Sequence, residues 1–212
     1  MTWAKSLSTR LVLALRSRLT PYQEMAKAMP PSGRIVDLGC GWGLLSLALC
    51  AGSADRKVLG IDHDPDRVTL AKRAAGHLPI TSRPEFQLGD IRTFLDSVAD
   101  GSLAGIAMID MLHYFDAETQ LSLIGQATRS LRQGGILLAR DIDAEDGLRS
   151  AFNKLYERLA TGVGFTRSAN ATMVFRSRSE WTELLRRAGF EVKSEHSGPT
   201  FLADVLLTAA KL

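Results

Sequence analysis

The chain has 212 residues, of which 45% are hydrophobic, and its 26 basic and 23 acidic side chains give a formal net charge of +3. This length can bury one sizeable core but is short for two independent domains, so we expect one domain. The small basic excess is no nucleic-acid footprint by itself. The two cysteines, Cys40 and Cys50, form no disulfide framework, and a reducing cytoplasm fits them.

Residues 1–29 open the chain with scattered basic residues around a short apolar run at 11–15, LVLAL. This run is below the roughly 7 to 15 residues of a signal-peptide core, and Arg16 and Arg18 stand where a small-residue cleavage site is expected. It is also too short to span a bilayer, so we expect no integral membrane segment. We predict an N-terminal helical lid over the ligand site or the sheet. The alternative is a docking element for a membrane surface or a partner such as a carrier protein.

The rest of the chain alternates apolar strands with helices. The segment Pro30-Pro31-Ser32-Gly33 ends the leading helix. The predicted strands are 34–38, 57–61, 85–88, 104–109, 136–140, 190–195 and 201–209, and the predicted helices are 43–50, 65–76, 117–131 and 179–188. This βαβ alternation predicts one Rossmann-like α/β domain over residues 1–212. Residues 145–178 break the rhythm, and we interpret them as a substrate-side insertion.

The segment Asp37-Leu38-Gly39-Cys40-Gly41-Trp42-Gly43 joins the first strand to its helix. A glycine-rich turn lets backbone approach a ligand closely, and a helix N-terminus offers free N–H groups. About 20 residues later Asp62 ends the second strand, where an acid can accept both hydroxyls of a ribose. The turn and the acid together predict a ligand that contains adenosine. A turn that merely links strand to helix is the alternative.

Two departures from the dinucleotide fingerprint narrow the choice of ligand. The glycines run Gly39, Gly41, Gly43 without a Gly-x-x-Gly interval, and Asp37 precedes them by two residues. An acid at that place would repel a pyrophosphate and attract a cation. S-adenosylmethionine (SAM) carries an α-ammonium and a sulfonium but no phosphate, so the charges favour SAM over NAD or FAD.

Several segments resemble the motifs of class I SAM-dependent methyltransferases. Residues 35–43, IVDLGCGWG, resemble motif I, and residues 59–65, LGIDHDP, resemble the second motif. Residues 87–91, QLGDI, resemble the segment with the third-strand acid, residues 131–135 the turn before strand five, and Gly189-Phe190 the late Gly-Phe. The resemblance covers most of the chain. It implies methyl transfer from SAM and a seven-stranded, mostly parallel sheet with an antiparallel last strand and helices on both faces.

The same resemblance implies roles for the cofactor-binding residues. Asp37 and Gly39 would serve the methionine half of SAM, Asp62 the ribose, and Asp90 with Ile91 the adenine. The full predicted set is Asp37, Gly39, Cys40, Gly41, Asp62, His63, Asp90, Ile91 and Asp110.

The segment 109–114, IDMLHY, ends the fourth strand, where this family lines the boundary between SAM and the acceptor. His113 is the candidate catalytic residue. If the acceptor is a phenol, a carboxylic acid or another hydroxyl, a neutral imidazole with a pKa of about 6.5 suits the removal of its proton. Methyl transfer can also gain its rate from alignment of the acceptor alone. In that alternative His113 only packs near the cofactor or bonds to backbone.

A metal-assisted reaction is the next possibility, because Asp110 and Asp141 stand where metal-dependent relatives place ligands. Position 142 is Ile, however, where an Asn is expected to complete an oxygen-rich Mg²⁺ site. Asp143 would point the other way along a strand. We therefore predict a metal-independent enzyme, with Asp141 and Asp143 as helix caps or partners of an arginine.

The sequence also limits the acceptor. A segment of the Asn-Pro-Pro-Tyr type, which grips a flipped amino base, does not follow the fourth strand, so we expect no nucleic-acid substrate. Arg167, Arg176 and Arg178, with nearby aromatic residues, could bind an acidic aromatic or carrier-tethered acceptor. Residues 110–113 and 140–143 also resemble methyltransferases of bacterial aryl-polyene pigment clusters.

We therefore predict a cytoplasmic methyltransferase for a small molecule, with an oxygen of a hydroxyl or carboxyl group as the favoured acceptor atom. One alternative is a catalytically silent SAM-binding module or partner subunit. Another is transfer to nitrogen or carbon. The sequence assigns neither the acceptor nor the oligomeric state.

Overall fold

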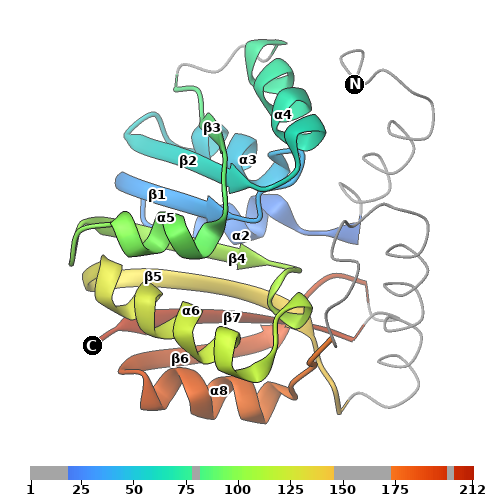
Figure 1. Ribbon diagram of the computed structural model, residues 1–212, viewed down its shortest axis with the longest axis vertical. Coiled ribbons are helices and arrows are strands. Elements are labelled where there is room, and N and C mark those ends of the chain that lie inside the picture. The colour runs from blue at the N-terminus through green and yellow to red at the C-terminus, as the bar shows by residue number, and fades with distance from the viewer. Residues whose placement is uncertain (1–18, 78–81, 146–172, 200–202) are drawn as a thin grey trace.

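The computed structural model describes residues 19–77, 82–145, 173–199 and 203–212. Its strands are β1 (Gly33–Leu38), β2 (Arg56–Asp62), β3 (Glu85–Leu88), β4 (Leu103–Ile109), β5 (Leu131–Ile142), β6 (Phe190–His196) and β7 (Asp204–Lys211). They form one sheet in the order β3-β2-β1-β4-β5-β7-β6 (Figure 1). The last strand, β7, is antiparallel to both of its neighbours, and the other pairs are parallel. The predicted fold class is confirmed.

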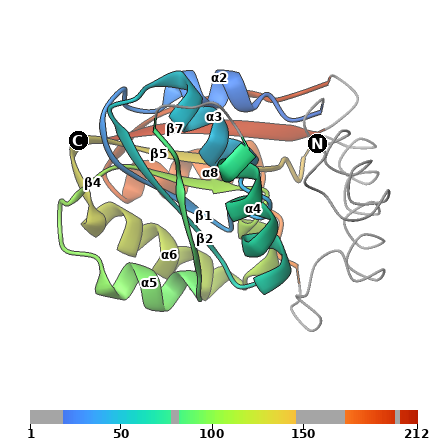
Figure 2. The ribbon, with the colours of Figure 1, turned by 90° about the horizontal axis from the view of Figure 1, so that it is seen from above.

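Helices cover both faces of the sheet. They are α2 (Tyr22–Ala28), α3 (Leu44–Gly52), α4 (Pro65–His77), α5 (Ile91–Ser97), the 3-10 helix η1 (Leu112–Tyr114), α6 (Ala117–Ser130) and α8 (Arg178–Arg187). Figure 2 shows α2 and α3 on one side of the sheet and α5 and α6 on the other. The carboxyl ends of the central strands remain for a ligand site, as in other open α/β sheets.

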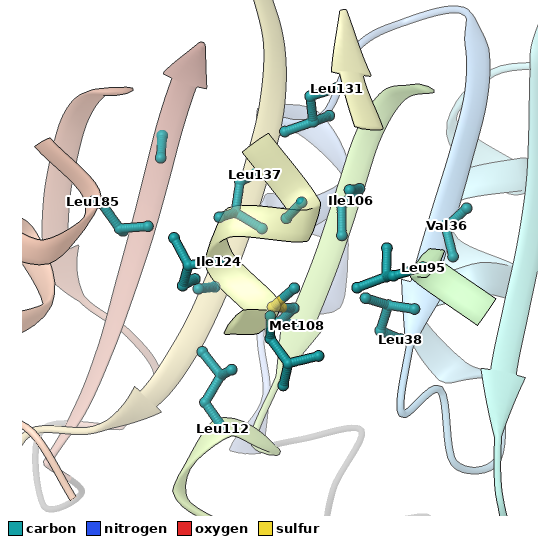
Figure 3. Close-up of a cluster of buried hydrophobic side chains, with 14 of the residues drawn as sticks. Val36, Leu38, Leu95, Ile106, Met108, Leu112, Ile124, Leu131, Leu137 and Leu185 are labelled. Atoms are coloured by element: carbon teal, nitrogen blue, oxygen red, sulfur yellow. The ribbon is translucent and has the colours of Figure 1, made fainter. Parts of the chain in front are cut away.

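Side-chain alternation along the strands feeds two cores. In β1, Val36 and Leu38 pack with residues of α5, α6 and α8, whereas Ile35 packs with α2 and α3. Figure 3 shows the first of these cores, where Ile106 and Leu137 from β4 and β5 approach Leu95, Ile124 and Leu185 of the helices. Because both faces are buried, the central strands are continuously apolar rather than alternating with polar residues.

The main differences from the predicted elements concern α5 and the junction of α6 with β5. No helix was predicted at α5, which is only seven residues long and starts at Asp90, whose side chain accepts from the backbone N–H groups of Arg92 and Thr93. The helix predicted to run to residue 131 ends at Ser130. Leu131 takes an extended conformation and pairs with Leu103, so β5 begins five residues earlier than predicted.

Parts of two predicted segments lie outside the described residues. These are residues 1–18 of the predicted N-terminal lid and residues 146–172 of the predicted insertion. The described end of the first segment includes α2, which buries Met25 and Ala26 against α3. The lid and the insertion therefore stay predictions. In the described ranges, no helix combines the length and the hydropathy that crossing a membrane requires.

Candidate functional site

A cavity of about 330 Å³ opens at the carboxyl ends of β1, β2 and β4. These ends point to the right in Figure 1. β1 lies between β2 and β4, so the chain reverses its direction of travel through the sheet at this point, which is where open α/β sheets bind ligands. All nine residues predicted to bind the cofactor line this cavity: Asp37, Gly39, Cys40, Gly41, Asp62, His63, Asp90, Ile91 and Asp110.

The glycine turn after β1 forms the floor of the cavity. Gly39, Gly41 and Gly43 have φ values of 65°, 53° and 76°, in the left-handed region that glycine adopts without strain. A Cβ atom on Gly41 would have no other heavy atom within 4 Å. The backbone N–H of Gly41 donates to Asp62 Oδ2 at 2.8 Å. The turn is thus held open toward the cavity by the acid at the end of β2.

Asp37 is the most deeply buried acid of the cavity, with 2% of its surface exposed. Ser46 Oγ, from α3, donates to Asp37 Oδ2 at 2.6 Å. Burial raises the pKa of Asp37 to about 7, although the hydrogen bonds from Ser46 act in the opposite direction. A carboxylate of this kind gains most from a nearby cation, because burial has removed its hydration.

Asp62 and His63 lie at the end of β2. Asp62 Oδ1 accepts from the backbone N–H of Asp64 at 2.9 Å, and Oδ2 accepts from Gly41 as described above. Each carboxylate oxygen has two lone-pair sites, so both can accept a further hydrogen bond from a ligand. His63 is exposed, and its Nδ1 lies 3.7 Å from Asp62 Oδ1. This geometry suits an acid that holds a diol beside an exposed ring.

Asp90 and Ile91 lie between β3 and α5. Asp90 caps α5, and Oδ1 accepts from the backbone N–H of Arg92 at 2.9 Å. The hydrogen bond from the Arg92 side chain lowers the pKa of Asp90, which therefore stays ionised. Ile91 is buried and packs into the core beneath α5. Both residues reach the cavity, so an apolar wall and a carboxylate meet at this end.

The charges of the cavity are unbalanced. The described lining residues include one guanidinium, on Arg67, and four carboxylates, on Asp37, Asp62, Asp90 and Asp110. Arg67 is already engaged, since its Nε lies 3.7 Å from Asp64 Oδ2 and its Cζ lies 5.0 Å from the Trp42 ring centroid. Such a lining attracts a cation and repels a pyrophosphate. The residues present therefore fit SAM, whose ammonium and sulfonium exceed its one carboxylate.

Ten further lining residues are outside the predicted cofactor-binding set, although Ile109, Met111 and Tyr114 belong to the segment predicted to line the boundary with the acceptor: Tyr22, Trp42, Leu44, Leu45, Arg67, Gly89, Ile109, Met111, Tyr114 and Phe115. Trp42 and Gly89 lie within the motifs at 35–43 and 87–91, so their positions in the sequence could have identified them. Tyr22 carries no such signal, because it reaches the cavity only through the packing of α2 on α3.

Asp110, directly after β4, has an unusual backbone. Its φ of 54° makes it the one non-glycine residue with a positive φ in the described parts of the chain. Its N–H donates to the carbonyl oxygen of Arg140 at 2.9 Å, and Arg140 Nη1 donates to its Oδ1 at 2.5 Å. Arg140 Nη2 also donates to Asp204, and Nε donates to Ser197 Oγ at 3.1 Å. Burial lowers the pKa of Arg140, but the charges of Asp110 and Asp204 outweigh it and hold the pKa above its usual value.

His113 lies in η1, and its side chain is only 1% exposed. Its Nδ1 is 2.6 Å from Asp141 Oδ1, and its backbone N–H donates to Asp141 Oδ2 at 3.0 Å. The ring stacks on Phe175 at 5.2 Å and touches Tyr114, with 4.2 Å between the ring centroids. Tyr114 lines the cavity, whereas the imidazole of His113 packs behind it, outside the lining. The role of His113 as a base stays a prediction.

Gln120, fully buried in α6, joins the wall formed by residues 112–115 to the described end of the predicted insertion. Its Nε2 donates to the carbonyl oxygens of Leu112 at 3.0 Å, Phe115 at 3.2 Å and Val174 at 2.9 Å. Its Oε1 accepts from Arg176 Nε at 2.7 Å. The wall formed by residues 112–115 is therefore held from behind by one carboxamide.

The carboxylates considered for a metal are bound to protein groups. Asp110 bonds to Arg140, and Asp141 bonds to His113. Asp143 Oδ1 accepts from the backbone N–H of Arg178 at 3.0 Å, at the start of α8. In the described ranges, no group of three or more His, Cys, Asp or Glu side chains is placed to hold a metal ion. Metal independence stays a prediction.

Comparison with known proteins gives a family for the central part of the chain. Residues 35–135 match the family described as a methyltransferase domain. The release factor glutamine methyltransferase of Escherichia coli (strain K12) is 41% identical over 58 residues, which are 27% of this chain and 21% of that protein. The trans-aconitate 2-methyltransferase of Methylobacterium nodulans is 27% identical over 181 residues, which are 82% of this chain and 65% of that protein. The chain thus spans from about a fifth to less than two thirds of the length of these relatives.

A solved structure of a SAM-dependent methyltransferase from Methanosarcina mazei has the same fold. It matches with a TM-score of 0.68 and 20% identity over 92% of this chain and 99% of that one. The predicted fold is confirmed, and the match over residues 35–135 implies SAM as the methyl donor.

Proposed function

We propose that this chain, in which residues 35–135 form a methyltransferase domain, transfers the methyl group of SAM to an oxygen of a small molecule without a metal ion. The observation that carries the proposal is the acidic cavity at the carboxyl ends of β1, β2 and β4. It supports a ligand that is cationic at one end and carries a ribose further along. SAM supplies a methyl group already activated by its sulfonium.

On the cofactor side of the cavity, different residues are proposed to bind different parts of SAM. Asp37 accepts a hydrogen bond from the α-ammonium. The nearby cation lowers the pKa of the Asp37 carboxyl, so that it loses its proton more easily. Asp62 accepts the ribose hydroxyls while Gly41 stays bonded to it. Asp90 and Ile91 contact the adenine, with His63 over its face. The glycine turn brings backbone close to the methionine half, where side chains would exclude it.

On the acceptor side, the protein aligns the acceptor and excludes water. Alignment at about 3 to 3.5 Å can supply much of the rate of a displacement at a sulfonium. Tyr114 and Phe115 support this role, because they line the cavity and are held by the contacts behind η1. The N-terminal lid and residues 145–178 would complete the enclosure.

His113 is the proposed general base, and this role requires its Nε2 to become accessible from the cavity, because the ring lies outside the described lining. Its pairing with Asp141 supports this role, because a carboxylate on Nδ1 stabilises the imidazolium that forms when Nε2 takes a proton. We expect His113→Ala to flatten the pH dependence of turnover and to spare SAM affinity. An unchanged profile would reject the base and leave His113 as a packing residue of the wall.

The acceptor is proposed as a small molecule with a hydroxyl or carboxyl group. The name of the Methylobacterium relative supports an organic acid. The Escherichia coli relative is named for a glutamine in a release factor and favours nitrogen instead, but its match covers 58 residues. A carrier-tethered acceptor, an aryl-polyene pigment pathway, contact with a membrane surface and a cytoplasmic location are finer proposals of the same kind.

The test begins with binding. Calorimetry of the full chain should show that SAM and S-adenosylhomocysteine (SAH) bind, and binding of neither would sink the proposal. Transfer of label from methyl-labelled SAM to hydroxylated and carboxylated acceptors then separates an enzyme from a silent binding module. Activity that survives EDTA supports metal independence, and activity restored only by Mg²⁺ contradicts it.

A further inference from the structure

Asp110 differs from the other acids of the cavity in how it is held. A left-handed backbone is unfavourable for an L-residue, although Asp tolerates it better than most. Strain of this kind persists where the surroundings impose it, and it gathers at functional sites. Asp110 stands at such a place, between the cofactor residues of β1 and the wall of residues 112–115.

Arg140 imposes this geometry. Its carbonyl oxygen takes the N–H of Asp110, and its guanidinium takes the carboxylate. The guanidinium cannot move to a ligand instead, because Asp204 and Ser197 hold it from the other side and 4% of its side chain is exposed. One guanidinium between two carboxylates leaves a net charge of −1. The position of the Asp110 carboxylate is therefore set before any acceptor arrives.

The cavity charges restrict what can bind beside Asp110. Among the described lining residues, four carboxylates face one guanidinium, and bound SAM adds a net charge of +1. A carboxylate-bearing acceptor would approach this group of acids without a matching cation. A neutral acceptor with a hydroxyl group would instead donate a hydrogen bond to a charged acceptor atom, which is stronger than a hydrogen bond between neutral groups.

The apolar residues that line the cavity with Asp110 indicate the shape of the acceptor. Tyr22, Met111, Tyr114 and Phe115 line the same cavity as Asp110. Aromatic and thioether side chains pack well against a ring. An acceptor with an aromatic ring and a neutral hydroxyl would match both the apolar lining and the carboxylate.

We propose that Asp110 is the residue that selects the acceptor, by accepting a hydrogen bond from the hydroxyl group of a neutral aromatic molecule and by repelling carboxylates. Arg140 is the positioning residue that holds Asp110 for this contact. The inference rests on the proposed function and deepens it, since it narrows the acceptor from a hydroxyl or carboxyl group to a hydroxyl group.

The test compares phenol with benzoate, which share a ring and differ in charge. Each is titrated into the SAH complex of the full chain, and binding is followed by ligand-observed NMR. The wild-type complex should bind phenol at least five-fold more tightly than benzoate. Asp110→Asn should reduce this preference to about two-fold or less, because the substitution removes the charge and keeps the shape. Asp100→Asn, the same change at an exposed site, should preserve the preference.

Arg140→Lys separates positioning from folding. It keeps the charge but loses the fork that reaches two carboxylates. Phenol should bind at least three-fold more weakly to this variant, while its SAH affinity stays within two-fold of wild type. Parallel losses of thermal stability, SAH affinity and phenol affinity would mean a merely structural role and would overturn the assignment of Arg140.

The remaining outcomes decide against the inference. Equal or tighter binding of benzoate by wild type overturns it, and so does failure of the SAH complex to bind phenol. An Asp110→Asn variant whose SAH affinity falls while its SAH complex keeps the wild-type preference for phenol would make Asp110 a cofactor residue only. A chain that binds no SAH contradicts the proposed function itself, which is a different result from these.

Discussion

The cofactor side and the acceptor side of the cavity are built on different ranges of the chain. On the cofactor side, Ser46 bonds to Asp37 across 9 residues, and Gly41 bonds to Asp62 across 21. These contacts stay within one strand–helix–strand unit, β1-α3-β2. The geometry of the cofactor side is therefore local, and short motifs are sufficient to encode it.

The acceptor side relies on longer connections. Asp141 is 28 residues from His113, Val174 is 54 from Gln120, and Asp204 is 64 from Arg140 in the chain. These bonds join η1, β5, α6, β7 and the segment before α8. Stability and acceptor geometry are therefore coupled on this side, whereas the cofactor side can change its affinity without unfolding.

The largest expected effect is on the acceptor side. Gln120→Leu would leave the carbonyl oxygens of Leu112, Phe115 and Val174 without their buried donor, and each such loss costs about 1–3 kcal/mol. We expect the free energy of unfolding to fall by about 3–5 kcal/mol in urea titrations followed by tryptophan fluorescence. Gln126→Leu, in the same helix, should cost under about 1 kcal/mol because it loses one bond near the surface. Equal losses in the two variants would refute the central role of Gln120.

The next effect belongs to the cofactor side. Asp62→Ala removes the acceptor of the ribose hydroxyls and the partner of the Gly41 N–H. SAH affinity measured by calorimetry should fall by about 100-fold, or about 3 kcal/mol, and the unfolding free energy should fall by about 1–3 kcal/mol because the Gly41 and Asp64 N–H groups lose their acceptor. Asp55→Ala, at an exposed site just before β2, serves as the control. Unchanged SAH affinity in Asp62→Ala would contradict the local encoding of the cofactor side, since the Asp62 motif would then not determine cofactor binding.

A pH dependence follows from Asp37. Its pKa rises from 3.8 to about 7 on folding, so the folded chain holds a proton that the unfolded chain has lost between these values. The stabilising contribution is complete below about pH 4 and is lost as pH rises through 7, with a slope of at most about 1.4 kcal/mol per pH unit.

Asp37→Asn, which cannot ionise, isolates this contribution. The difference in unfolding free energy between the variant and the wild type should be constant below about pH 4 and should widen in favour of the variant up to about pH 7. SAH should bind the wild type more weakly below pH 7, because the proton competes with the ammonium. A difference that does not vary with pH would show that Asp37 is ionised throughout.

The smallest effect on stability is expected on α8, away from both sides of the cavity. Arg187 Nε and Glu183 Oε1 are 2.7 Å apart on α8, but the two side chains are 79% and 55% exposed. An exposed pair of this kind contributes about 0.3–0.5 kcal/mol. Arg187→Ala should leave SAH binding unchanged and shift the thermal midpoint only slightly. A large shift would show that α8 has a role that its contacts do not explain.

Sequence patterns predicted the strands better than the short helices. β3 was predicted with the bounds that the structure has, because Glu85–Leu88 alternates polar and apolar residues between polar turns. α5 was missed, because its seven residues bury only Ile91 and Leu95 and therefore show too little periodicity. Its start depends on the Asp90 cap, a residue to which sequence reasoning had given a ligand role alone.

The structure brings the nine predicted cofactor residues to one cavity for a related reason. The nine predicted residues follow the ends of neighbouring parallel strands, and such ends meet at one edge of a sheet. His113 shows the limit of this reasoning. Its place after β4 indicated the cavity, but the direction of its ring was decided by Asp141 and Phe175, which lie 28 and 62 residues further along the chain.

The sequence by itself determined the fold class, the glycine turn and the acids that line the cofactor side, because these depend on strand ends and on backbone freedom within a few residues. Only the tertiary structure decided how the groups on the side proposed for the acceptor are arranged. Asp110 lines the cavity because Arg140 holds it there, and His113 packs behind Tyr114 because Asp141 binds its ring. Contacts between residues far apart in the chain leave no local pattern, so they appear only when the sheet has brought their partners together.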